Sequence, residues 1–323
     1  MQKFCSTVIF WHVVSVSILS LKAFSLEKAR AFHGEMISDL DLITLAKSGF
    51  WPGPLEPEDL FLQRIARTRY MHTQNQSVFN PLMAQSISEI TEDRFGISIL
   101  EVPIIFCNKG LSFWEGAALW IEKSEGYVVP EIQVRTGFQK GSYLFYDTKE
   151  VVSHEMLHAA RVYYNEPRYE EILAYQTARS PFRKYMGPLF ETPTQTWVFM
   201  SLFGIGLIAD IICPIVGLLH EIPWLLVAVL WILFLGFRLH LRQKTFRKAL
   251  LHLQQVLSEP TEALSMMAKL TDVEIEVFSH LKSHQILAFL QSKQDSELRM
   301  RMLILIHFSN GLHSSHISYS PYG

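Results

Sequence analysis

Cysteine is scarce in this sequence, and its charges are few and balanced. The 323 residues include three cysteines, Cys5, Cys107 and Cys213, which lie far apart. An odd number of widely spaced cysteines favours neither a disulfide framework nor a cysteine-rich zinc cluster. Charged residues make up 19% of the chain, the formal net charge is -2, and no basic stretch is interleaved with aromatic residues. We therefore expect no nucleic-acid partner, because such partners require a basic surface.

The segment 151–160 carries a metal-binding motif. His154-Glu155-Met156-Leu157-His158 has the spacing His-Glu-x-x-His. On a helix this spacing stacks the two imidazoles on one face and keeps the glutamate beside them. Zinc hydrolases use three protein ligands and an open fourth position, and a nearby carboxylate takes a proton from the attacking water. The motif predicts one Zn²⁺ per chain, held by His154 and His158, with Glu155 as the general base.

A third ligand is needed downstream of the motif. Asn165-Glu166-Pro167 is predicted to end the first helix, and Arg168–Ala178 to form a second one that carries Glu170 and Glu171. Together with the motif, Glu171-Ile172-Leu173-Ala174 resembles the gluzincins, zinc peptidases whose third ligand is a glutamate in the context Glu-x-x-Ala. The resemblance covers roughly residues 95–185. It implies that Glu171 is the third ligand, with Glu170 as the alternative, and that the chain hydrolyses a peptide or protein substrate.

The sequence departs from the gluzincin pattern four residues after Glu171. Many gluzincins have an aspartate there that holds the first histidine, and this chain has Tyr175. The resemblance also implies a side chain that stabilises the oxyanion, and Tyr175, Arg179 and Tyr185 are the candidates. We name Tyr175 as catalytic beside Glu155. Because the aspartate is missing, a catalytically inactive zincin-like membrane scaffold or binding protein remains the alternative.

A hairpin is expected just before the motif. Residues 131–135 alternate as a strand, 136–141 look like a turn, and 142–146 look like a second strand. Gluzincins have a similar edge strand and turn there, to which the substrate backbone adds as an antiparallel strand. By this resemblance Gly137 and Phe138 would bind substrate. The alternative is an ordinary hairpin with no role in binding.

Two long apolar segments follow the second helix. Residues 197–219 contain one charge, Asp210, and residues 222–237 contain none. They predict a transmembrane hairpin in a lipid bilayer, and the alternative is a buried helical pair in a soluble core. Basic residues flank both segments and none lies between them, so the positive-inside rule places the catalytic domain on the cytoplasmic face. The flanking residues are Arg179, Arg183, Lys184, Arg238, Arg242, Lys244, Arg247 and Lys248.

The predicted organisation has five parts, and the fold class is α+β. Residues 1–25 form an apolar segment that resembles a membrane anchor or a signal peptide. Residues 26–190 form a zincin-like metallopeptidase domain of helices and a small sheet. The transmembrane hairpin occupies 197–240. An α-helical region over 241–308, with a helix start at Thr271-Asp272-Val273-Glu274, is available to dock a protein partner or the catalytic domain. Residues 309–323 are expected to be disordered. Together these features predict a membrane-anchored zinc metalloendopeptidase.

Overall fold

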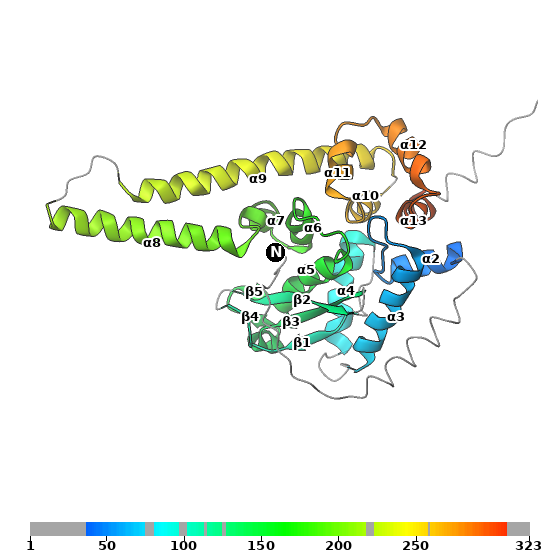
Figure 1. The fold of residues 1–323 in the computed structure, drawn as a ribbon, viewed down its shortest axis with the longest axis horizontal. Helices are drawn as coiled ribbons and strands as arrows, with labels where there is room; N and C mark the ends of the chain where they lie inside the picture. Colours follow the sequence, from blue (N-terminus) through cyan, green and yellow to red (C-terminus); the bar gives the residue numbers. More distant parts are fainter. Residues whose placement is uncertain are drawn as a thin grey trace, which may run out of the picture.

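The computed structural model describes residues 37–74, 81–96, 102–112, 115–124, 127–217, 223–257 and 259–308. The described chain combines many helices with a small sheet and two long apolar helices (Figure 1). This confirms the coarse prediction of a mixed helix-and-sheet fold with two apolar helices. The predictions for residues 1–25 and 309–323 lie outside the described residues.

Three helices precede the sheet. They are α2 (Asp39–Lys47), α3 (Glu58–Gln74) and α4 (Pro81–Phe95). The hydroxyl of Ser38 accepts a hydrogen bond from the backbone N–H of Asp41, which fixes the start of α2. Leu42, Phe61 and Ile87 are fully buried, one from each helix, so the three helices contribute to the core of the domain.

The main sheet has three strands in the order β1-β3-β2. Strand β3 (Tyr127–Val134) lies in the middle, parallel to β1 (Ile104–Phe106) and antiparallel to β2 (Ala117–Ser124). Ile132 and Val134 of β3 are fully buried. Helix α3 and the motif helix α5 (Thr148–Ala160) both pack on this sheet, so the motif helix rests on a rigid support.

The predicted hairpin over residues 131–146 is wrong. Residues 131–134 belong to the central strand β3, in which 132–134 pair with β1 on one side and with β2 on the other. The chain then forms a 3-10 helix, η1 (Thr136–Lys140), because Phe138 turns into the core and is only 1% exposed. A separate hairpin follows, made of β4 (Ser142–Tyr143) and β5 (Tyr146–Asp147). The strands at the two edges of the sheet are β1 and β2.

Two long helices leave the domain side by side (Figure 1). Helices α8 (Pro193–Ile215) and α9 (Leu225–Gln254) are both long and apolar enough to cross a membrane. In their most apolar windows only 6% and 17% of the residues are buried, which argues against a helical pair inside a soluble core. The predicted α-helical region does not begin with a new helix at residue 241, because α9 continues into it without a break.

Asp210 joins the two long helices. Its carboxylate accepts hydrogen bonds from the backbone N–H groups of Trp224 (2.7 Å) and Leu225 (3.0 Å), at the start of α9. Gly206, one turn earlier on α8, lets the backbones approach, since a Cβ there would lie 3.1 Å from atoms of Trp224 and Leu225. The charged residue in the apolar segment therefore caps the neighbouring helix.

Four helices complete the described chain. They are α10 (Pro260–Met267), α11 (Asp272–Phe278), α12 (Ser283–Lys293) and α13 (Leu298–His307). The predicted start of α11 is confirmed, because Thr271 and Glu274 form a reciprocal capping box. These helices pack on α9, α4 and α2, so the C-terminal region belongs to the same hydrophobic core as the domain that carries the motif.

Candidate metal centre

The motif helix α5 presents both histidines on one side. It starts at Asp147, whose carboxylate accepts a hydrogen bond from the backbone N–H of Lys149 (2.8 Å). Val152, Met156 and Leu157 are buried in the core and fix the rotation of the helix. His154 and His158, four residues apart, stand with their rings 4.9 Å apart between centroids, as helix geometry requires.

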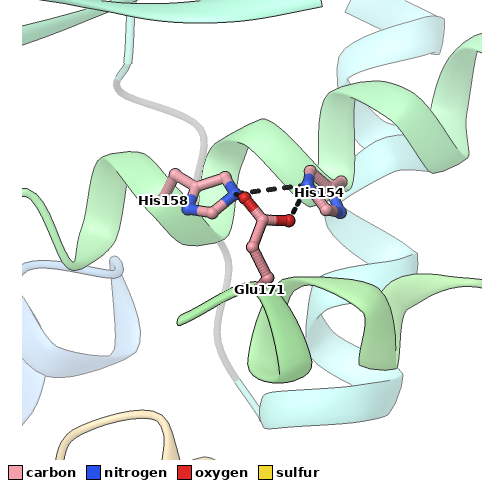
Figure 2. Close-up of side chains that lie close together, drawn as sticks. All are labelled: His154, His158 and Glu171. Atoms are coloured by element: carbon pink, nitrogen blue, oxygen red, sulfur yellow. Dashed lines mark hydrogen bonds and ion pairs between the residues drawn. The ribbon is translucent and has the colours of Figure 1, made fainter. Parts of the chain in front are cut away.

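Helix α6 (Glu170–Ala174) brings Glu171 to the two histidines (Figure 2). The two carboxylate oxygens of Glu171 lie 3.5 Å from Nε2 of His154 and 3.5 Å from Nε2 of His158, and the two Nε2 atoms are 3.2 Å apart. One ligand atom from each residue lies within 4.8 Å of the others. Among the described residues, no other group of histidine, cysteine or carboxylate side chains converges in this way.

These separations fit a tetrahedral zinc site. Zinc binds nitrogen and oxygen ligands at about 2.0–2.1 Å, so neighbouring ligand atoms of a tetrahedron lie roughly 3.3 Å apart. The two Nε2 atoms, 3.2 Å apart, match this spacing, and each Nε2 has one oxygen of the Glu171 carboxylate at 3.5 Å, a different oxygen for each histidine. The side chains of His158 and Glu171 are buried, and that of His154 is 17% exposed, so the cluster opens to one side. A fourth position on that side could take a water or a substrate oxygen.

Glu170 has a different role from its neighbour. Its carboxylate lies 2.8 Å from Nδ1 of His158, on the far side of the ring from Glu171. An Nδ1–H that donates to this carboxylate leaves Nε2 of His158 free to bind a metal. Burial alone lowers the pKa of His158, but the charges of Glu171 and Glu170 outweigh it, so the pKa is raised. Glu170 was predicted only as the alternative to Glu171 for the third metal ligand.

Tyr175 packs on His154. It lies in η2 (Tyr175–Thr177), and its ring meets the His154 ring edge to face, with centroids 4.6 Å apart. Gly187, in η3 (Gly187–Leu189), makes room for this ring, because a Cβ there would lie 2.2 Å from a Tyr175 ring carbon. Burial raises the pKa of the Tyr175 phenol, so its hydroxyl stays protonated and can donate a hydrogen bond. Tyr175 therefore packs its ring against His154 at the sequence position where many gluzincins have an aspartate.

A cavity of about 200 Å³ opens beside the cluster. His154, Glu155 and Tyr175 line it, together with Phe138. Gly137 does not line it, since its α-carbon packs against the Tyr143 ring, where a Cβ would lie 2.3 Å away. The other two oxyanion candidates do not reach the cavity either: Arg179 pairs with Asp147 at 3.2 Å, and the Tyr185 hydroxyl lies 2.9 Å from Nδ1 of His240.

Sequence reasoning missed two parts of this cavity. Residues 115–117, which lead into β2, form one wall, and Tyr143, Leu144 and Tyr146 of the β4–β5 hairpin form another. Nothing in the local sequence indicates that these residues lie at a sheet edge beside the motif helix. Glu155 lies between these walls, where it can reach a substrate.

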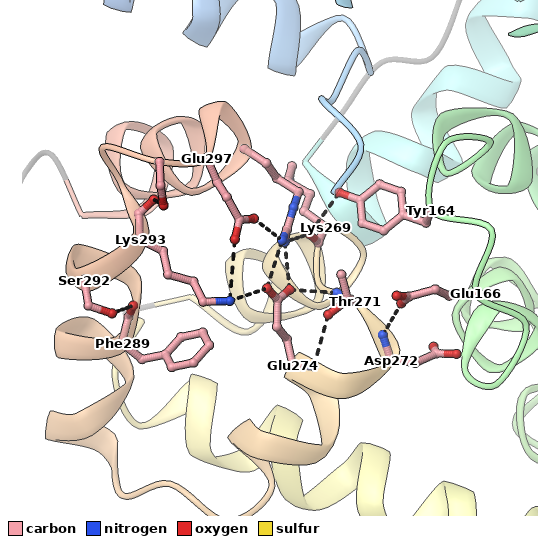
Figure 3. A network of polar contacts seen from close by, with 12 residues as sticks. Tyr164, Glu166, Lys269, Thr271, Asp272, Glu274, Phe289, Ser292, Lys293 and Glu297 are labelled. Carbon is pink, nitrogen blue, oxygen red and sulfur yellow. Dashed lines mark hydrogen bonds and ion pairs between the residues drawn. The ribbon is translucent and has the colours of Figure 1, made fainter. Parts of the chain in front are cut away.

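The connection between α5 and α6 is fastened to the C-terminal region (Figure 3). The Asp272 carboxylate accepts hydrogen bonds from the backbone N–H groups of Arg168 (2.8 Å) and Tyr169 (3.2 Å), the two residues before Glu170. The Asp272 N–H in turn donates to Glu166, and the Tyr164 hydroxyl donates to the carbonyl of Lys269 (2.9 Å). The start of α6, and with it Glu170 and Glu171, is therefore positioned by residues about a hundred positions later in the chain.

The chain matches no protein-family model, no curated protein and no solved structure. The resemblance to gluzincins therefore rests on the motif residues, and their function must be argued from the geometry of the cluster and its cleft.

Proposed function

We propose that this protein is a membrane-anchored zinc metalloendopeptidase of the gluzincin type, with a zincin-like domain that hydrolyses peptide bonds in a peptide or protein substrate. The observation that carries the proposal is the convergence of the His154, His158 and Glu171 ligand atoms within 4.8 Å, beside a cavity lined by Glu155. The chemistry of this donor set, two imidazoles and one carboxylate, is that of catalytic zinc.

Each residue of the cluster has a chemical role in this proposal. His154, His158 and Glu171 would hold the zinc, which would supply Lewis-acid chemistry for the scissile carbonyl and the attacking water. The Glu155 carboxylate accepts the proton of that water and passes it to the nitrogen of the leaving amine. The Tyr175 hydroxyl donates a hydrogen bond to the carbonyl oxygen as negative charge develops there. Glu170 keeps His158 in the tautomer that a ligand needs.

The same proposal places α8 and α9 across a lipid bilayer. Their exposed apolar side chains suit lipid, and Asp210 supplies acceptors for backbone N–H groups of α9 that lipid could not satisfy. Arg238 and Arg242 mark the end of the apolar part of α9, where both pair with Glu191. By the positive-inside rule this end, and the domain beside it, face the cytoplasm.

Metal analysis of the detergent-purified protein tests the zinc site. We expect about one zinc per chain in the wild type, and loss of the metal in His158→Ala and Glu171→Ala. His280→Ala is the matched control, because His280 is exposed on the surface and should leave the zinc content unchanged. A folded wild-type protein that holds no zinc after purification without chelators would overturn the proposal.

Hydrolysis separates the enzyme from a domain that only binds. We expect the zinc-loaded wild type to cleave members of a mixed peptide library, detected by mass spectrometry. Glu155→Gln should keep the zinc and lose the cleavage, since the amide cannot accept the proton. If wild type and Glu155→Gln both bind zinc and leave the same library intact, the protein is a zincin-like scaffold instead of a peptidase.

A further inference from the structure

The β4–β5 hairpin exposes large apolar side chains at its tip. Tyr143 and Tyr146 pair across the strands, which leaves Leu144 and Phe145 as a two-residue turn. Leu144 is 71% exposed and Phe145 is 96% exposed. Phe182, on the neighbouring helix α7 (Pro181–Met186), is 71% exposed. Exposing three large apolar side chains to water on two neighbouring elements is unfavourable, which points to another surrounding for them.

The turn itself is unfavourable for the residues that form it. Leu144 has φ +53°, in the left-handed region, and two-residue hairpin turns strongly favour asparagine and glycine at such positions. A residue with a Cβ atom costs roughly 1–2 kcal/mol in this conformation, because the Cβ lies close to the following carbonyl oxygen. Both side chains are largely exposed, so burial compensates for little of this cost, which points to a purpose for their apolar surface outside the turn.

The hairpin tip lies beside the base of the two long helices. The guanidinium of Arg183, next to Phe182 on α7, stacks over the Tyr146 ring at 4.6 Å, which joins α7 to β5. The other end of α7 is joined to α9, where Gln243 donates to the carbonyl of Tyr185 at 3.3 Å. In Figure 1, β4 and β5 lie on the side of the domain from which α8 runs out.

We propose that Leu144, Phe145 and Phe182 enter the lipid interface beside the two spanning helices. The occupant of this patch is the boundary between headgroups and acyl chains, where apolar tips, tyrosines and basic residues are all favourable. Lys140, before β4, is exposed and supplies positive charge that anionic headgroups attract, and Arg179, two residues before α7, is exposed beside its ion-pair partner Asp147. The proposal rests on the membrane placement proposed above and is independent of the zinc chemistry.

This placement defines where a substrate would enter. Tyr143, Leu144 and Tyr146 line the cavity beside Glu155, so one wall of the catalytic cleft is formed by the hairpin that contacts lipid. The cleft then opens at the membrane surface. The chemical class of substrate that fits is a polypeptide segment lying close to the bilayer, such as the stretch next to a transmembrane span.

Site-specific fluorescence measures the depth of the tip. In a chain whose three native cysteines are replaced by serine, Phe145→Cys carries an environment-sensitive dye, and the protein is placed in nanodiscs of phosphatidylcholine and phosphatidylglycerol. Ile208→Cys on α8 and Leu40→Cys on α2 are matched controls, with exposures of 58% and 74%. Lipids bearing a nitroxide near the headgroup or near the acyl-chain end report shallow or deep contact.

We expect the dye at position 145 to shift its emission to shorter wavelengths and to lose most of its intensity with the shallow nitroxide. The dye at position 208 should respond to the deep nitroxide, and the dye at position 40 to neither. If position 145 behaves like position 40 while position 208 is quenched, the tip stays in water, or it contacts a second copy or a substrate, and the proposal is overturned. If position 208 is not quenched either, the membrane placement fails as well, and the zinc site is unaffected by that result.

Discussion

Removal of the Asp272 carboxylate should weaken zinc binding, although Asp272 lies outside the metal cluster. Its two hydrogen bonds hold the backbone of Arg168 and Tyr169, immediately before Glu170 and Glu171. A hydrogen bond to a charged acceptor contributes about 1.5–3 kcal/mol when buried. Tyr169 is fully buried, but the Arg168 position is exposed and water replaces part of its bond, so we estimate a loss of about 2 kcal/mol for Asp272→Ala.

This loss of stabilising free energy should lower the affinity for zinc, because α6 must be ordered to present Glu171. If all of it is expressed in the metal site, 2 kcal/mol corresponds to a Kd for zinc about 30-fold weaker. Competition with a chromophoric chelator measures that Kd on purified protein without any substrate. Asp272→Asn keeps a carbonyl acceptor and should lose only part of the affinity.

Glu276→Ala is the matched control for this experiment. Glu276 forms an ion pair with the Arg168 side chain, but both side chains are well exposed, and such pairs are worth less than about 1 kcal/mol. We expect its zinc affinity to stay within a few-fold of the wild type. An Asp272→Ala protein that binds zinc as tightly as the wild type, while its C-terminal region is destabilised, would refute the idea that this contact positions the third ligand.

Four further predictions test single contacts. Glu170→Gln should weaken zinc binding by about 10–100-fold in the chelator assay and leave the fold intact, and equal affinity would show that the contact to His158 is incidental. Tyr175→Phe keeps the ring against His154, so we expect unchanged zinc content and a kcat lower by about 10²–10³-fold, whereas full activity would assign Tyr175 to packing alone. Burial lowers the pKa of Lys269 from its ordinary value of 10.5 to about 7, so between these two pH values the unfolded state binds more protons than the folded state. The free energy of unfolding should therefore rise with pH over that range by up to about 1.4 kcal/mol per pH unit. Denaturant titrations measure this slope, and Lys269→Met should remove it. Asp210→Ala should lower the melting temperature in detergent because it leaves two N–H groups of α9 unpaired, and Asp210→Asn should recover part of the loss.

Several features followed from local sequence alone. Helix geometry suffices to place His154 and His158 on one face, and hydropathy suffices to find α8 and α9. The start of α11 after Thr271 could be predicted because its capping box is formed by two residues that are three positions apart. In each case the deciding interactions lie within one helix or follow from its overall composition.

Other features depended on contacts between distant parts of the chain. The alternating pattern of residues 131–146 predicted a hairpin, but the burial of Phe138 breaks it into a strand, a 3-10 helix and a shorter hairpin. No local sequence pattern predicted that residues 115–117 would form one wall of the cleft. Local pattern did not choose between Glu170 and Glu171, because adjacent residues on a helix point about 100° apart and only the rotation of α6 decides which one faces both histidines. The resemblance to the Glu-x-x-Ala context favoured Glu171, but it gave no role to Glu170 beyond that of the alternative ligand.

The rotation of α6 is not fixed by α6 itself. A five-residue helix cannot hold its own conformation in water, since nucleation costs more than one turn returns. The contacts that fix it come from Tyr169, which is fully buried, and from Asp272 in the C-terminal region. A metal that binds Glu171 therefore stabilises the docked arrangement of the C-terminal region, and docking strengthens metal binding by the same free energy. Since α9 carries that region on the extension of a proposed membrane span, force or binding at the C-terminal helices would be transmitted to the third ligand. The C-terminal helices would in this sense belong to the proposed metal site, although none of their described side chains lies in the cluster of His154, His158 and Glu171.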